Sequence, residues 1–106
     1  MKILALDPGT TETGWCVYEN EHGVKTCGIT PNPEMLSAIQ NMAKQPQANW
    51  LLVIEWIEAM GMAVGKETFE TVRWIGRFQQ AWANPEAVRF VTRRQVKLHL
   101  CNNMRA

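Results

Sequence analysis

Long apolar segments are missing from this sequence of 106 residues. No run reaches the ~18 apolar residues of a transmembrane helix. The short apolar stretch that follows Met1 lacks the cleavage site that ends a signal peptide. We therefore expect a cytoplasmic protein with no membrane partner, and the length is that of a single domain, residues 1–106.

Cysteine and histidine are also scarce. The three cysteines are widely spaced and form no CxxC pair, which favours a reducing compartment over a disulfide framework or a zinc site. The two histidines have no evident acid or serine partner, which argues against a catalytic triad. The residues concerned are Cys16, Cys27, Cys101, His22 and His99.

The net charge is only +1, but it is unevenly distributed. Residues 1–85 contain six Lys or Arg against nine Asp or Glu, which gives −3. Residues 86–106 contain five against one, which gives +4. A basic end on a mildly acidic body indicates either a polyanion partner or a solvated helix face.

Apolar periodicity and turn residues predict the element order β-β-β-α-β-α-β-α. The predicted strands are residues 2–7, 13–18, 25–29, 50–54 and 87–91. The predicted helices are residues 33–44, 66–82 and a last one from about residue 93, with Thr92 as its cap. The core face of the second helix is predicted to carry Phe69, Val72, Ile75, Phe78 and Trp82.

This order predicts an α/β fold. Three strands joined by tight turns are antiparallel, whereas strands separated by helices are parallel through right-handed crossovers. We expect a mixed sheet with helices packed on its faces.

Two of the apolar strands end on an acid, Asp7 and Glu55. If these strands are parallel neighbours, they lie ~4.8 Å apart and their two carboxylates repel unless a cation lies between them. Mg²⁺ or Mn²⁺ suits such a site, and carboxylates from different strands at one sheet edge are the layout of two-metal phosphodiester hydrolysis. The alternative is a pair of unrelated acids that cap nearby loops.

The segment "GMAVGKET" at residues 61–68 contains two glycines and has the outline of a phosphate loop. It has three residues between its glycines instead of four, and Glu67 stands where Ser or Thr is needed. An acid at that position repels phosphate, so we do not expect a nucleotide P-loop. Glu58, a further acid close to Glu55 in sequence, is expected to be solvated.

Three segments in sequence order, "LALDPGTTETGW", "LVIEWIEAMGMAVGKETFETVRWIGRF" and "VRFVTRRQVKLHLCNNMRA", cover most of the chain. Together they resemble the RuvC-like Holliday junction resolvases of the ribonuclease H-like superfamily, phage-encoded relatives above all. The resemblance implies a ribonuclease H-like mixed sheet and implies that Asp7 and Glu55 are catalytic metal ligands of a four-acid site.

The family takes its other two ligands from a helix further along the chain. This sequence ends at Ala106, where that helix would begin, so the resemblance implies a C-terminally truncated domain with an incomplete two-metal site. The chain is then either a fragment of a longer enzyme or a shortened product that no longer cuts. The end of the sequence carries no helix stop signal, which favours a fragment.

The resemblance implies a metal-dependent endonuclease for four-way junction DNA, acting as a homodimer because two symmetric nicks need two sites. Flanking phosphates would be neutralised by Lys66, Arg93, Arg94 and Lys97. Two alternatives stay open. One is a DNA-binding or interaction module without catalysis. The other is an ATP-binding fragment, because "DPGTTETG" also looks like the first phosphate loop of actin-like and sugar-kinase ATPases.

Overall fold

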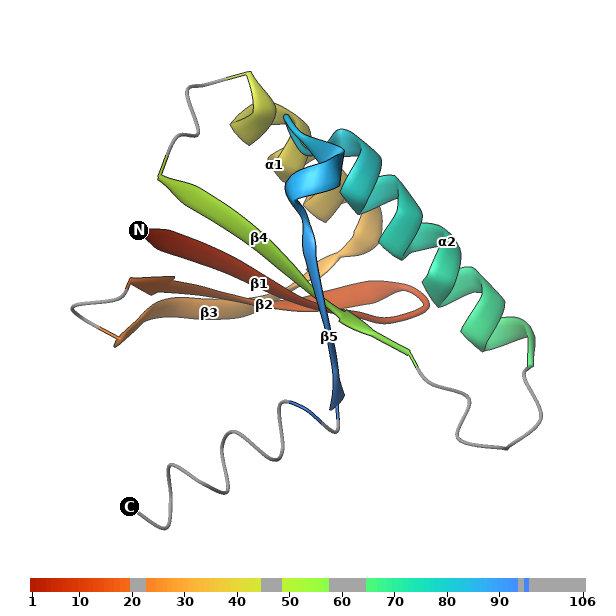
Figure 1. The fold of residues 1–106 in the computed structure, drawn as a ribbon. Helices are drawn as coiled ribbons and strands as arrows, with labels where there is room; N and C mark the ends of the chain where they lie inside the picture. The colour runs from red at the N-terminus through yellow and green to blue at the C-terminus, as the bar shows by residue number, and fades with distance from the viewer. Residues whose placement is uncertain (20–22, 45–48, 58–64, 94, 96–106) are drawn as a thin grey trace, which may run out of the picture.

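The computed structural model describes residues 1–19, 23–44, 49–57, 65–93 and 95 of the chain. Within these ranges the predicted order of strands and helices is confirmed as far as the last strand (Figure 1). The elements are β1 (Lys2–Pro8), β2 (Glu12–Glu19), β3 (Gly23–Pro31), α1 (Asn32–Ala43), β4 (Trp50–Trp56), α2 (Lys66–Ala81), a short 3-10 helix (Pro85–Ala87) and β5 (Arg89–Thr92). Most of the last predicted helix lies outside the described residues.

The five strands form one mixed sheet in the order β3-β2-β1-β4-β5. The hairpins β1–β2 and β2–β3 are antiparallel, whereas β4 pairs in parallel with both β1 and β5. This arrangement is the predicted one, in which short turns join the antiparallel strands and helical crossovers lead to the parallel strands. It makes β1 the central strand, flanked by β2 and β4.

The last strand begins at Arg89, two residues later than predicted. Pro85 opens a 3-10 turn instead, in which the Ala87 amide donates to the Asn84 carbonyl at 3.0 Å. Proline presets the backbone angle that such a turn needs and lacks the amide proton that a strand uses, so the extended conformation starts only after it.

Both described helices, α1 and α2, pack on the same face of the sheet (Figure 1), and most of the third predicted helix lies outside the described residues. The cause is the direction of the two crossovers. The chain passes from β3 to β4 and from β4 to β5, in the same sense along the sheet. Right-handed connections that run in one sense place their helices on one side.

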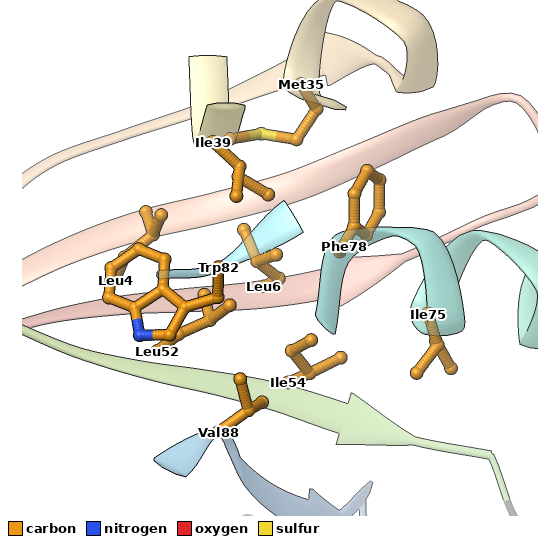
Figure 2. Close-up of a cluster of buried hydrophobic side chains, with 10 residues drawn as sticks. All are labelled: Leu4, Leu6, Met35, Ile39, Leu52, Ile54, Ile75, Phe78, Trp82 and Val88. Carbon is orange, nitrogen blue, oxygen red and sulfur yellow. The ribbon is translucent and has the colours of Figure 1, made fainter. Parts of the chain in front are cut away.

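The core lies between this sheet face and the two helices (Figure 2). Alternate residues of a strand point to one face, so every second residue of β1 and β4 enters the core. The buried hydrophobic residues are Leu4, Leu6, Met35, Ile39, Leu52, Ile54, Ile75, Phe78, Trp82 and Val88. None of the described helices is long and apolar enough to cross a membrane.

The prediction for the core face of α2 is correct at Ile75 and Phe78 but wrong at Phe69, whose side chain is 61% exposed. Thr71 is buried in its place. Residues 71, 75 and 78 follow the spacing of one helix face, whereas residue 69 lies two positions, about 200°, away from residue 71. The spacing of the apolar residues alone therefore gave the wrong phase for the first turn of this helix.

A disulfide joins Cys16 of β2 to Cys27 of β3, contrary to the expectation from cysteine spacing. The two residues are directly opposite in the β2–β3 register, and their Cα atoms are 4.1 Å apart. Cys16 is half-buried and is not among the core residues. The pairing depends on strand register, which the spacing of eleven residues does not reveal.

We expect reduction of this bond to destabilise the fold. Closing so short a loop lowers the entropy of the unfolded chain by an amount worth about 2–3 kcal/mol. Urea unfolding with and without reductant should show that difference in the wild type. Reductant should not change the unfolding free energy of a variant with both Cys16→Ala and Cys27→Ala. If it does not change that of the wild type either, the disulfide is contradicted.

Candidate functional site

The acids Asp7 and Glu55 lie at the same edge of the sheet, as predicted. The parallel register pairs Leu6 of β1 with Ile54 of β4, so the next residue on each strand is one of the acids. Because Leu6 and Ile54 point into the core, the acids point to the opposite face, away from α1 and α2.

The two acids differ in exposure. Asp7, at the end of a strand with a buried face, is itself exposed. The Glu55 side chain keeps only 19% of its accessible surface. Asp7 needs no partner to offset desolvation, whereas Glu55 does.

The environment raises the pKa of Glu55 above its ordinary value of 4.5. Burial is the main cause, since it penalises the ionised form, and the negative charge of Asp7 adds to it. A hydrogen bond between the two carboxyl groups also favours the protonated form of Glu55. The site thus carries more negative charge than it can neutralise, which is the condition that a bound cation relieves.

Arg93 supplies part of the missing positive charge. Its Nε donates to Glu55 Oε1 at 3.2 Å, and its side chain is 71% exposed. It follows β5, which pairs with β4 so that Val91 lies opposite Glu55. The guanidinium lowers the pKa of Glu55 but does not outweigh burial and Asp7.

The backbone that carries Arg93 is fixed by the predicted cap at Thr92. The Gln95 amide donates to Thr92 Oγ1 at 3.1 Å, and the Thr92 amide donates to Gln95 Oε1 at 2.8 Å. This reciprocal pair is a capping box. It confirms Thr92 as a helix cap and holds the first turn, which includes Arg93, in place.

Asn32 fixes the turn that follows Asp7, and sequence reasoning missed it. Its side chain is fully buried and donates from Nδ2 to the Gly9 carbonyl at 2.9 Å. The Thr13 hydroxyl donates to Asn32 Oδ1 at 2.5 Å, and the Asn32 amide donates to the Thr11 carbonyl at 2.9 Å. One side chain at the start of α1 therefore ties the β1–β2 turn to the beginning of β2.

The same turn is closed locally and is also attached to α2. The Gly9 amide donates to the Glu12 carbonyl at 2.9 Å, and a Cβ at Gly9 would lie 2.7 Å from that oxygen. Only glycine therefore fits there without a shift of the turn. The Thr10 hydroxyl lies 3.4 Å from that of the buried Thr71, so the turn that follows Asp7 contacts both of the described helices, α1 and α2.

The remaining predicted DNA contacts are only partly placed. Lys66, the first residue of α2, pairs with Glu70 at 3.7 Å and is not among the charges that shift Glu55. Arg94, Lys97, Glu58 and residues 61–64 of the glycine-rich segment lie outside the described residues. Of the four predicted phosphate contacts, Arg93 is the one that the structure joins to the acid pair.

Two carboxylates with water are a donor set that fits a hard divalent cation. Over the part of the chain that is described, no group of three or more His, Cys, Asp or Glu side chains could hold a metal. The described site is therefore a pair of carboxylates, Asp7 and Glu55, with Arg93 beside them.

A search of known protein families gives no match to this chain. A probable butyrate kinase of Bacteroides thetaiotaomicron is 31% identical to it over 107 residues. The alignment covers 96% of this chain but only 30% of the kinase, so the chain spans less than a third of that relative.

Glu55 should make stability depend on pH. The pKa of Glu55 is raised in the folded state, so the folded state binds the carboxyl proton more tightly than the unfolded state does. The stabilisation that this proton gives is present at low pH and is lost as the pH rises from about 4.5. Glu55→Gln removes that dependence. We expect the free energy of unfolding of the variant to rise relative to that of the wild type as the pH increases from 4 to 7. Urea unfolding at several pH values measures this free energy, and Glu86→Gln is the charge control. A difference between Glu55→Gln and the wild type that stays constant across this pH range would contradict the raised pKa of Glu55.

Asn32→Ala should destabilise the protein because it leaves the Gly9 carbonyl and the Thr13 hydroxyl without their partner. Unpaired buried polar groups cost about 1–3 kcal/mol each, so we expect a loss of about 2–4 kcal/mol in unfolding free energy. The control is Asn41→Ala on the exposed side of α1, which should change stability by less than about 0.5 kcal/mol. Equal effects of the two substitutions would show that the network is not needed.

Proposed function

We propose that this chain is part of a metal-dependent, structure-specific DNA endonuclease of the Holliday junction resolvase type, with a ribonuclease H-like fold. The observation that carries the proposal is the pair of carboxylates, Asp7 and Glu55, at the ends of two neighbouring parallel strands. The order of antiparallel hairpins followed by α1, β4, α2 and β5 supports it, since that is the order that the resemblance implies.

The proposed site binds Mg²⁺ or Mn²⁺ through Asp7 and Glu55. Such a cation, when bound, stabilises the charge that develops on the scissile phosphate and on the leaving oxygen. Glu55 also accepts a hydrogen bond from the attacking water and so orients it. Its partial burial keeps the carboxylate in one position, which favours that role over loose solvation.

In this proposal Arg93 binds a DNA phosphate. It is an exposed guanidinium at the edge that holds the acids, and it can contact a phosphate without reading a base. We propose the same role for Lys66, Arg94 and Lys97. A homodimer follows from the substrate, because two nicks placed symmetrically need two sites.

With only two carboxylates described, we expect weak metal binding and slow cleavage by this chain alone. Mg²⁺ keeps most of its waters and depends on substrate phosphate when few protein ligands are present. Further ligands from a longer protein would complete the site. Junction binding with little nicking is therefore the expected behaviour of these 106 residues.

The second candidate is an ATP-binding fragment, and the identity shared with a probable butyrate kinase favours it. In this reading the turn after Asp7 contacts phosphate and Asp7 holds the cation. Glu55 has no assigned role in this interpretation, whereas the nuclease proposal uses it as the second cation ligand. The third candidate, a DNA-binding module without catalysis, differs from the first only in the absence of any nick.

One set of assays separates the three candidates. Labelled four-way junction and linear duplex of equal length are tested for binding without metal and for nicking with Mn²⁺, and ATP is tested by calorimetry with Mg²⁺. We expect tighter binding to the junction and slow nicks that Asp7→Asn and Glu55→Gln abolish. Glu86→Gln, an exposed acid on the 3-10 helix, should leave both unchanged.

Other outcomes assign the chain differently. Junction binding with no nick under any metal condition would support the binding module. ATP binding that Asp7→Asn abolishes, together with no preference for the junction, would replace the nuclease by the kinase-like candidate.

A further inference from the structure

The bond between Arg93 and Glu55 joins one fixed group to one movable group. Glu55 stands on a central strand and keeps 19% of its side-chain surface, whereas Arg93 keeps 71%. The backbone of Arg93 is held by the Thr92–Gln95 capping box, so the freedom lies in its side chain. The guanidinium can therefore leave Glu55 without disturbing the sheet.

Glu55 is shared between two neighbours. Arg93 Nε occupies Oε1 at 3.2 Å, and Asp7 is hydrogen-bonded to the same carboxyl group. A divalent cation bound between the two acids needs an oxygen from each of them. The positive charge of that cation repels the neighbouring guanidinium, so cation binding weakens the hold of Arg93 on Glu55.

We propose that Arg93 is a positioning residue that holds Glu55 while no cation is bound, and that cation binding releases it to bind a phosphodiester at the same edge. This inference rests on the proposed function, because it requires the acid pair to bind metal. It assigns Arg93 two alternating partners of like charge, the Glu55 carboxylate and a DNA phosphate. An exposed ion pair is worth only about 0.2–1 kcal/mol, which is weak enough for such an exchange.

The exchange couples the two binding events. If the cation frees Arg93 for the phosphate, the phosphate must strengthen cation binding by the same factor. A permanent Arg93–Glu55 pair predicts no such coupling through this residue. The distinction can be measured without any cleavage.

The test is Mn²⁺ binding, followed by the electron paramagnetic resonance of the free ion, with and without a thymidine dinucleotide as phosphodiester probe. Arg93→Gln removes the repelling guanidinium and should tighten Mn²⁺ binding about two- to fivefold, the ratio that corresponds to an exposed ion pair. The dinucleotide should tighten Mn²⁺ binding in the wild type and should do so less in Arg93→Gln. Arg93→Lys keeps the charge and should lie between them.

The matched control is Arg89→Gln. Arg89 is exposed at the start of the same strand and lies opposite Val53. It stands two residues before the position opposite Glu55, and its charge is not among those that shift the pKa of Glu55. It removes the same charge without touching Glu55, so Mn²⁺ binding should change by less than about 1.5-fold.

The outcomes distinguish the inference from the proposed function. Mn²⁺ binding that depends on Asp7 and Glu55 but responds equally to Arg93→Gln and Arg89→Gln would overturn the role of Arg93 and leave the metal site standing. Mn²⁺ binding that Asp7→Asn and Glu55→Gln do not weaken would overturn both. Unchanged thermal unfolding of Arg93→Lys shows that the comparison is made on folded protein.

Discussion

The parallel pairing of β1 with β4 is the contact on which the candidate site depends. It sets Leu6 beside Ile54 in the core and thereby fixes Asp7 beside Glu55 on the other face. A shift of one residue in this register would exchange the two faces of β4 and bury the acid in place of Ile54. The apolar core therefore determines the position of the carboxylates more strongly than any contact between the acids themselves, which repel each other.

The turn after β1 shows how the remainder of the site is held. The network of Asn32 with Gly9, Thr11 and Thr13 joins the start of α1 to this turn through buried hydrogen bonds. On the other side, the capping box at Thr92 fixes the turn that carries Arg93. Hydrogen bonds therefore hold the backbone of the turn after Asp7 and of the turn that carries Arg93, whereas the Arg93 side chain is exposed.

Sequence patterns predicted the parts of this molecule that depend on local order. Strands that end on acids, tight turns between the first three strands and helices between the later ones were enough to place Asp7 and Glu55 at one edge. Thr92 was recognisable as a cap because its residue type and position are local signals. Contacts between distant segments were not accessible in this way. The Cys16–Cys27 disulfide needs the β2–β3 register, the burial of Asn32 needs the position of α1 against the turn, and the exposure of Phe69 needs the rotation of α2 about its axis.

The separation of the paired strands along the chain has a consequence for folding. The three-stranded β1–β3 unit closes through local contacts, whereas Lys2 pairs with Trp50, 48 residues further along the chain. Closing so long a loop costs more entropy than forming a hairpin, so we expect β4 to pair with β1 after the hairpins have formed. The acid pair is therefore assembled in a late step, when β4 docks beside β1, and the repulsion between the two carboxylates opposes that step. A nascent chain that has made only its first three strands lacks the strand that carries Glu55, and so it has no acid pair.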